Sequence, residues 1–501
     1  MISLELACVY LIPVLTSLLY VYPIRPSWLG RIQVVSSIAL FILIAQIIHS
    51  ISQLGPQFFA GHLIYMDALS AIFMLLIGLI SVFTAVYSMR YMLNEEEEKL
   101  RNPWKLRIFY IMFNLFILSM IGMVTVNSLG VYWVAIEAST LFSAFLVGYY
   151  SQKKPIEAAW KYIILCTVGI AFALIGLVLT YYAVQKMQGD ISQGLDWVYL
   201  LSIANRLEPN LIKASFIFIL IGFGTKAGLA PMHNWLPDSY SEAPTPASAL
   251  LSGILSKCAL YGIIRYSVLS NLVLGNGFSQ QFLLFFGLFS LAIAVPFILL
   301  QKNIKRLLAY SSVEHMGIIA TGLGFGTPIA VFGALFHLLN HALAKSILFF
   351  AAGNLSLKFH TKEIPHIHGA IKYMPITGTL LLLTGLALAG TPPFSVFMSE
   401  FYIAWGGFTS QAWLQSLLFI ALLVIVFGGF SYQLLQMTVG PSPNLFTETT
   451  NAIPIGEMNQ SGLVALLLPF LLLLIFTWWL PGPLITLLHQ AVTIITGKTI
   501  Q

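Results

Sequence analysis

Apolar stretches of roughly twenty residues recur along the whole chain, separated by short polar or basic connections. An α-helix of that length, rising about 1.5 Å per residue, crosses a hydrocarbon layer of about 30 Å. The pattern predicts about fourteen transmembrane helices, with a more polar interfacial segment at residues 190–209. The predicted spans are residues 3–22, 32–54, 66–91, 105–127, 129–150, 159–184, 211–230, 245–268, 277–300, 306–325, 328–357, 373–404, 411–437 and 461–487.

The composition supports this prediction. Of the 501 residues, 58% are apolar and 8% are charged, whereas soluble domains carry about 25% charged residues. We therefore expect an all-α polytopic membrane protein. No basic segment precedes the first span and no small-residue cleavage site follows it, so we expect a retained helix rather than a cleaved signal peptide. The three cysteines lie singly, and no CxxC pair or nucleotide-binding glycine motif is present, which predicts no redox or nucleotide site on this chain.

Basic residues are unevenly distributed over the predicted loops. Sixteen lysines and arginines fall on one face and five on the other. Since basic residues concentrate on cytoplasmic loops, the richer face is predicted to be cytoplasmic and both termini to lie away from it. The net charge of +6 then reflects membrane topology rather than nucleic-acid binding. The five residues of the poorer face are Lys186, Arg206, Lys213, Arg265 and Lys498.

Three lysines fall well inside predicted spans, namely Lys226, Lys257 and Lys345. A lysine at mid-membrane costs about 2.5 to 3.5 kcal/mol on insertion scales, so each needs a partner, water or a function. Burial also disfavours the charged form of a lysine and can bring it to titrate near neutrality, which suits proton transfer. The alternative is snorkelling, in which the ammonium reaches the membrane interface.

Acidic residues and histidines extend the pattern. Glu137 lies in the fifth span and Glu400 in the twelfth, and such groups normally face the interior of a bundle and mark ion or proton paths. Spacings of four place His337, His341 and Lys345 on one helical face. Imidazole has an unperturbed pKa near neutrality, which favours a proton relay, although a buried histidine can be merely hydrogen-bonded. Glu314 and His315 are further candidates, with a packing role for Glu314 as the alternative.

Asp67 begins the third span, where a carboxylate complements the helix dipole.

Two of the predicted spans contain clusters of glycine and proline. Residues 222–244 read GFGTKAGLAPMHNWLPDSYSEAP and residues 386–397 read LALAGTPPFSVF. Non-helical backbone at membrane depth is tolerated only where it lines protein or water, and paired interruptions indicate an inverted repeat with its ion site near the midplane. The predicted organisation is residues 1–104 as helices one to three, 105–268 and 269–438 as two inverted five-helix units, and 439–501 as a loop and a last helix.

These segments carry a family resemblance. GFGTKAGLAPMHNWLPD, LLSGILSKCALYGIIR, AYSSVEHMG and HALAKSILFFAAGN resemble the antiporter-like subunits shared by respiratory complex I, Mrp-type sodium/proton antiporters and membrane-bound hydrogenases. SEAPTPASALLSG and SVEHMG look most like the hydrogenase-4 component F branch. The resemblance spans roughly residues 105–405 and implies fourteen helices with two inverted five-helix units, each a proton half-channel.

The resemblance also implies roles for individual residues. Glu137 would partner Lys226 on the broken seventh helix, Lys257 would be the central lysine, and Lys345 with His341 and His337 would connect to Glu400 as the exit. His233 and Asp238 are further pathway candidates. Relatives commonly have a histidine where this chain has Tyr240 in WLPDSY, so the resemblance assigns no proton-entry histidine at this position.

The resemblance places the chain in the cytoplasmic membrane of a prokaryote. Its partners would be other membrane subunits and peripheral redox subunits that carry iron–sulfur clusters and a nickel–iron centre. We expect no metal on this chain, because the loop histidines His360, His366 and His368 lack a supporting cysteine or carboxylate. Other functions stay open: an ND4-like subunit of an NADH or ferredoxin:quinone oxidoreductase, an Mrp-type cation/proton antiporter subunit, or a structural anchor.

Overall fold

The chain is almost entirely helical in the computed structural model, which describes residues 2–98, 102–440, 454–458 and 460–499. Its α-helices are α1 (Ile2–Leu19), α2 (Pro26–Leu54), α3 (Ala68–Glu98), α4 (Pro103–Thr125), α5 (Leu129–Val147), α6 (Lys153–Lys186), α7 (Trp197–Ser202), α8 (Pro209–Ala227), α9 (Trp235–Glu242), α10 (Thr245–Leu250), α11 (Ser256–Leu274), α12 (Phe278–Leu300), α13 (Ile304–Phe325), α14 (Pro328–Phe359), α15 (Ala370–Tyr373), α16 (Pro375–Leu388), α17 (Ser395–Thr409), α18 (Trp413–Thr438), α19 (Gln460–Trp478) and α20 (Gly482–Thr496). Short 3₁₀ turns cover Ile191–Gln193, Ala204–Arg206 and Ile364–His366, and a π-helical segment covers Leu251–Leu255.

Among the described residues, ten helices are long and apolar enough to cross a membrane, or eleven if one bent pair counts as a single span. The chain is therefore a multi-pass membrane protein. The bent pair is α19 and α20, which meet at 72°. The sequence predicted one continuous span at residues 461–487, and the difference arises because Pro481 and Pro483 cannot continue a helix.

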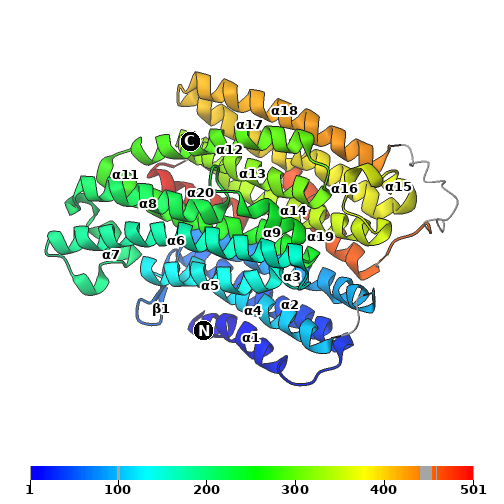
Figure 1. Cartoon of the computed structure of the whole chain (residues 1–501). Coiled ribbons are helices and arrows are strands. Elements are labelled where there is room, and N and C mark those ends of the chain that lie inside the picture. The colour runs from blue at the N-terminus through cyan, green and yellow to red at the C-terminus, as the bar shows by residue number, and fades with distance from the viewer. Residues whose placement is uncertain (1, 99–101, 441–453, 459, 500–501) are drawn as a thin grey trace.

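The helices run side by side in one layered bundle, with α1 at one edge and α18 at the opposite edge (Figure 1). Two helical segments form the centre: in the membrane-length windows of Thr245–Leu274 and Pro328–Phe359 every residue is buried. Around them, α12 packs against α13, α6 against α8, and α14 against α17. Lys257 and Lys345 lie on these two central segments and Lys226 on the adjoining α8, and all three are 0% exposed, so protein rather than lipid surrounds them.

Both predicted interruptions are present. The helix α8 ends at Ala227, Gly228 adopts φ +85°, and α9 begins at Trp235. The helix α16 ends at Leu388, Gly390 adopts φ +81°, and α17 begins at Ser395. Glycine is required at such positions because an L side chain is strained at positive φ.

The sequence did not predict a short hairpin between α2 and α3. Its strands β1 (Gln57–Phe59) and β2 (Ile64–Met66) pair antiparallel, with Phe58 opposite Tyr65. Directly after β2, Asp67 accepts the backbone N–H of Ser70 at 3.0 Å, which confirms that it caps the start of α3.

A buried ion pair joins this region to the centre of the bundle. The Arg265 guanidinium donates to both Asp67 carboxylate oxygens at 2.6 and 2.7 Å, and the two residues are 2% and 1% exposed. The assignment of Arg265 to a loop was therefore wrong: it lies inside α11, because a bidentate carboxylate compensates its burial.

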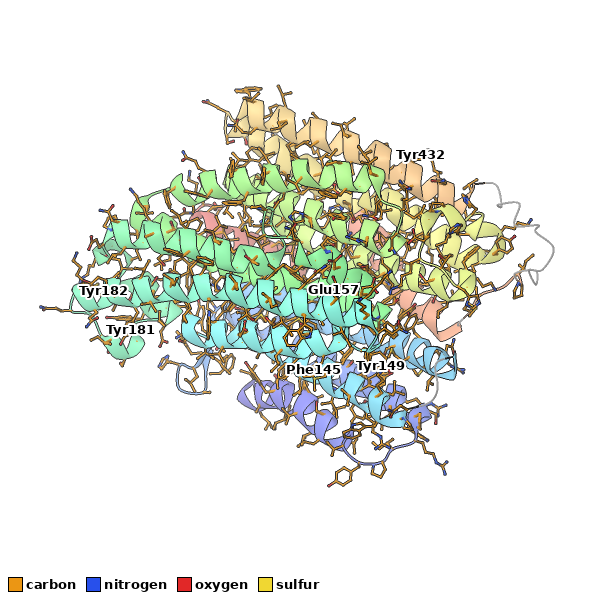
Figure 2. All side chains as sticks on the ribbon, viewed as in Figure 1. Phe145, Tyr149, Glu157, Tyr181, Tyr182 and Tyr432 are labelled. Carbon is orange, nitrogen blue, oxygen red and sulfur yellow. The ribbon has the colours of Figure 1, made fainter. Side chains whose placement is uncertain are left out.

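Large apolar side chains cover the outer faces of the bundle. Figure 2 shows Tyr182 and Tyr432 projecting outward from α6 and α18, and both are exposed, as are Val178, Leu417 and Val424. Such a surface would be an aggregation liability in water, and lipid acyl chains would cover it in a membrane.

Candidate functional site

The first buried cluster surrounds Lys226 in the last turn of α8. This lysine is 0% exposed, and its ammonium donates to the Thr140 hydroxyl at 2.7 Å and the Tyr162 hydroxyl at 2.5 Å. Tyr162 in turn contacts the Ser143 hydroxyl at 2.7 Å. The ammonium therefore has two neutral oxygen acceptors, and its charge is also near the Tyr162 ring, 4.5 Å from the centroid.

Glu137 lies on the same helix as Thr140 but does not pair with Lys226 in this conformation. One of its carboxylate oxygens accepts a hydrogen bond from Thr167 at 2.8 Å, and the other is buried without a hydrogen-bond partner. Among the described residues no ion pair joins Glu137 to Lys226. The expectation that Glu137 holds the lysine directly is therefore not met here, because the hydroxyls of Thr140 and Tyr162 take that place.

Lys257 lies at the very centre of the bundle. It follows the π-helical segment of residues 251–255, and its ammonium donates to the Ser252 carbonyl, five residues back on the same helix. The Ser252 hydroxyl is 2.9 Å from that of Ser312 on α13. A π-helical turn shifts the backbone register, which lets a side chain reach a carbonyl that a regular helix would bond internally.

Tyr240 connects the broken span to this segment. Its hydroxyl donates to the Leu251 carbonyl at 3.0 Å and lies 2.9 Å from the Ser256 hydroxyl. A phenol can donate and accept a proton in turn. Tyr240, which replaces the expected histidine, thus joins α9 to Ser256, the residue before Lys257.

The second buried cluster combines α13 and α14. His337, His341 and Lys345 are all 0% exposed, in agreement with a shared inner face. The Lys345 ammonium donates to the Leu308 carbonyl at 2.7 Å and also to the Ser311 hydroxyl.

His315 connects the two α14 histidines. Its Nδ1 is 2.9 Å from Nε2 of His337, and its ring centroid is 4.8 Å from that of His341. The rings of His337 and His341 are farther apart, at 6.4 Å between centroids. The contacts among these three histidines therefore run between α13 and α14 rather than along α14 alone.

Glu400 on α17 completes this cluster. His337 Nδ1 is 2.9 Å from the Ser399 hydroxyl, and donor atoms of His315, His337 and Glu400 all lie within 4.8 Å of one another. Glu400 is 7% exposed, and it lines an apolar groove of about 300 Å³ between α17 and α18. Glu314 is also buried, with Oε2 at 3.9 Å from His315 Nε2.

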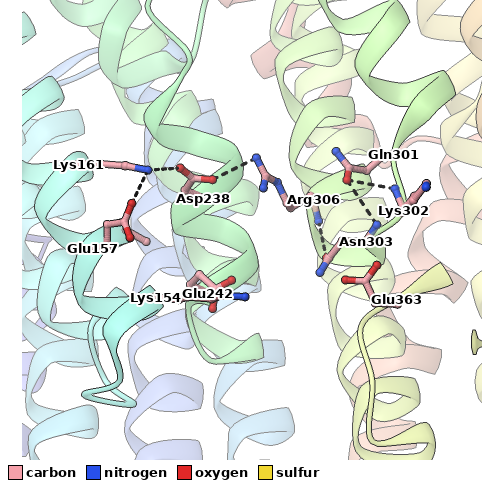
Figure 3. A pocket seen from close by; sticks show the side chains of 11 residues that line it. Lys154, Glu157, Lys161, Asp238, Glu242, Gln301, Lys302, Asn303, Arg306 and Glu363 are labelled. Atoms are coloured by element: carbon pink, nitrogen blue, oxygen red, sulfur yellow. Dashed lines mark hydrogen bonds and ion pairs between the residues drawn. The ribbon is translucent and has the colours of Figure 1, made fainter.

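Asp238 lies in a charged cavity of about 380 Å³ at one end of the bundle. Its carboxylate bridges Lys161 on α6 at 3.3 Å and Arg306 on α13 at 3.2 Å (Figure 3). The cavity also contains Glu157 and Lys302. His233 is buried in the segment between α8 and α9, with its ring centroid 6.4 Å from that of Tyr310 on α13. A charged cavity beside the broken span can admit water and protons.

Sequence reasoning missed the neutral hydroxyl groups. Thr140, Tyr162, Ser311 and Ser399 each contact a titratable side chain. Hydroxyl residues are common in membrane helices, and nothing in their spacing distinguishes these four. Thr140 alone offered a weak signal, because it lies three residues after Glu137 and so on the same face of α5.

Comparison with known proteins gives consistent matches. The family described as NADH:quinone oxidoreductase/Mrp antiporter, TM, matches residues 125–426, and that described as NADH-ubiquinone oxidoreductase (complex I), chain 5 N-terminus, matches residues 58–101. A hydrogenase-4 component F homolog from Methylacidiphilum infernorum (isolate V4) is 39% identical over 76% of this chain and 80% of that protein.

Solved structures share the fold over nearly the whole chain. A chain of the membrane-bound sulfane sulfur reductase, an archaeal respiratory membrane complex, aligns with a TM-score of 0.82 and 25% identity, over 99% of this chain and 96% of that one. A chain of the Mrp complex from Dietzia sp. DQ12-45-1b aligns with a TM-score of 0.83 and 16% identity, over 99% and 97%. The second likeness concerns the fold alone.

Proposed function

The chain belongs to the family of membrane subunits shared by NADH:quinone oxidoreductases and Mrp antiporters, and on that premise we propose that it is a proton-translocating, antiporter-like subunit of a redox-driven complex of the hydrogenase-4 or formate hydrogenlyase type. One observation carries the proposal. Titratable side chains that are almost fully buried occur at intervals through the inner helices, from Lys226 through Lys257 and the three histidines to Glu400. A purely structural anchor would have no need of such costly groups.

The proposed proton path follows the contacts. Lys226 exchanges protons through Tyr162 and Thr140, and Tyr240 with Ser256 connects this region to Lys257. Lys257 lies beside the Ser252 and Ser312 hydroxyls. Water completes the gaps between these groups, because hydrogen-bonded water transfers protons as hydroxyls do.

From the central lysine the path enters the second cluster. His341 contacts His315, whose hydrogen bond to His337 is aligned for transfer between two imidazoles. Lys345 and Glu314 adjust the charge around this step, and Glu400 releases the proton. His233 and Asp238 supply the first cluster from the charged cavity.

We propose that Glu137 controls the first step. When its carboxylate approaches Lys226, it stabilises the ammonium, and when it withdraws, as in this conformation, the lysine has only neutral acceptors. A unit charge a few ångströms away changes the energy of a group by several kcal/mol at an effective dielectric constant near 20. A charge shift in a neighbouring redox-driven subunit would therefore load or release the proton.

The finer architecture is part of the proposal. Residues 105–268 and 269–438 form two inverted five-helix units within fourteen spans, preceded by residues 1–104 and followed by 439–501. Supporting this, each unit contains one broken helix, with a positive-φ glycine just after the first half. An odd number of spans per unit turns the second unit upside down.

Location and partners follow from the family and the loop charges. We propose a prokaryotic cytoplasmic membrane, with both termini away from the cytoplasm. Iron–sulfur clusters, and a nickel–iron centre in a hydrogenase, belong to partner subunits, and this chain carries no cofactor of its own. Two alternative assemblies have support from the matches: an ND4-like subunit of an NADH or ferredoxin:quinone oxidoreductase, and an Mrp-type antiporter subunit.

Copurification distinguishes these assemblies. The tagged chain is extracted in mild detergent, its partners are identified by mass spectrometry, and hydrogen evolution is assayed. A nickel–iron large subunit with hydrogen activity supports the proposal, flavin and NADH-binding partners indicate complex I, and small membrane subunits alone indicate an antiporter.

Variants of the assembled complex test the proton path. We expect Lys226→Ala, Lys257→Ala and Glu137→Gln each to abolish proton transport in vesicles while electron transfer continues at least in part. Unchanged coupling in all three would refute the path.

A further inference from the structure

The cluster of His315, His337 and Glu400 has the composition of a metal site, which the sequence did not indicate. We propose that it binds a single Zn²⁺ or similar divalent transition-metal ion. Three donor atoms from α13, α14 and α17, one from each residue, lie within 4.8 Å of one another. Two imidazole nitrogens and one carboxylate oxygen form a donor set that zinc uses in proteins with a fourth position open. Na⁺, Mg²⁺ and Ca²⁺ prefer oxygen ligands and would not select this set.

An outer hydrogen bond orients one of the two imidazoles, and a carboxylate lies near the other. The other nitrogen of His337, Nδ1, is 2.9 Å from the Ser399 hydroxyl. The other nitrogen of His315, Nε2, faces the Glu314 carboxylate at 3.9 Å. Metal-binding histidines almost always hydrogen-bond a partner through the other nitrogen, which fixes the tautomer and leaves the ligating nitrogen free of a proton. Ser399 is such a partner for His337, and Glu314 would become one for His315 on moving closer.

Unpartnered polar groups provide independent support. The Glu400 side chain is only 7% exposed, so little water reaches it. Both ring nitrogens of His341 are buried without a partner, and its ring lies 4.8 Å from that of His315. A buried polar group without a partner costs about 1 to 3 kcal/mol, and more if charged. An ion between these residues would satisfy the carboxylate and place His341 beside the open position.

The required movement is small. Two donors about 2.1 Å from one tetrahedral ion lie about 3.4 Å apart. His315 Nδ1 and His337 Nε2, now 2.9 Å apart, must open slightly, and the carboxylate, within 4.8 Å of them, must approach by at most about 1.4 Å. The groove beside Glu400 leaves room for its side chain to rotate. The buried carboxylates of Glu314 and Glu400 would offset the two positive charges of the ion, and the buried Lys345 belongs to the same cluster.

The ion would take the place of the proton shared by His315 and His337. Bound metal would then interrupt proton transfer at this step, so the site would be inhibitory. This consequence rests on the proposed function, whereas metal binding itself does not.

The test uses the complete complex purified in mild detergent and incubated with Zn²⁺, or with Co²⁺ as a spectroscopic probe. We expect one Zn²⁺ per chain after gel filtration, and zinc-edge X-ray absorption that shows a nitrogen/oxygen shell with imidazole scattering. Glu400→Gln should weaken the affinity more than about 100-fold, and Glu314→Gln, which alters an outer contact, about 10- to 100-fold.

The control replaces the loop histidines His360, His366 and His368 with glutamine, which should leave the binding unchanged. Binding that survives Glu400→Gln, or that disappears in the loop variant, would overturn the site. Even if a variant misfolds, the zinc-edge X-ray absorption spectrum of the unaltered protein tests the site. A zinc coordination shell without imidazole scattering would exclude His315 and His337 as ligands. Binding without inhibition of proton transport would retain the site and refute the relay through His315 and His337.

Discussion

Replacing Arg265 with methionine should destabilise the protein strongly, because it leaves the Asp67 carboxylate buried without its counter-ion. The guanidinium donates at 2.6 and 2.7 Å to that carboxylate, at 3.0 Å to Ser70 and at 2.8 Å to Tyr261. Removing one partner of such a buried pair costs about 3 to 5 kcal/mol, mostly through the uncompensated charge.

Removing both charges should cost much less. Apolar replacement of a whole buried pair is often neutral or stabilising by about 1 to 4 kcal/mol. We therefore expect Asp67→Leu with Arg265→Met to be more stable than Arg265→Met alone. The strong coupling between the two changes measures the interaction, since the residues are in direct contact.

The assay is thermal unfolding of the purified protein in detergent, followed by intrinsic fluorescence. Trp197 lies close to the pair, with its ring 5.1 Å from the guanidinium, and will report on the local change. The order of melting temperatures should be unaltered protein and double variant above the single variant. A single variant that melts with the unaltered protein, or a double variant that melts lower still, would refute the reasoning.

Three further outcomes are expected. Tyr162→Phe removes one of the two acceptors of the Lys226 ammonium, and with it a hydrogen bond to a charged group worth about 1.5 to 3 kcal/mol. Proton transport in vesicles should fall by about 10-fold or more while electron transfer stays unchanged. Equal transport in the variant and the unaltered protein would exclude Tyr162 from the path. Gly333→Ala places a Cβ 2.9 Å from the backbone oxygen of Ser399, which forces α17 away from α14 and should lower both the melting temperature and proton transport. In the control Gly428→Ala the new Cβ meets nothing within 4 Å, so this variant should be neutral or slightly stabilising. Tags at both termini should be accessible to protease from the outer face of intact cells, and protection of either would contradict the proposed topology.

The corrections to the sequence analysis have a common origin. The spans were predicted because each helix must satisfy its own backbone and present apolar side chains to lipid. Those demands are local. The partner of Lys226 depends instead on how closely α5, α6 and α8 approach, and the hydroxyls of Thr140 and Tyr162 are nearer than Glu137. Differences of an ångström decide such contacts, and no residue spacing encodes them.

The same distinction applies to the histidines. A spacing of four placed His337 and His341 on one face of α14, and both are fully buried. The hydrogen bond joins His337 to His315, however, which comes from another helix and lies 22 residues earlier in the chain. The spacing could not predict this contact because neighbours on a helix surface are about 5 to 6 Å apart at Cβ, and side chains from a facing helix can come closer.

The sequence by itself determined that this protein is a multi-pass helical membrane protein, that two of its spans are broken, and that Lys226, Lys257 and Lys345 lie within its spans. Hydropathy, proline and glycine suffice for these, because they act through the backbone of each segment and its solvent. Only the tertiary structure decided that Arg265 is buried against Asp67, that a π-helical segment brings Lys257 to the Ser252 carbonyl, and that donor atoms of three helices converge at Glu400. Those contacts join residues through the packing of separate helices, and packing is a property of all the side chains together.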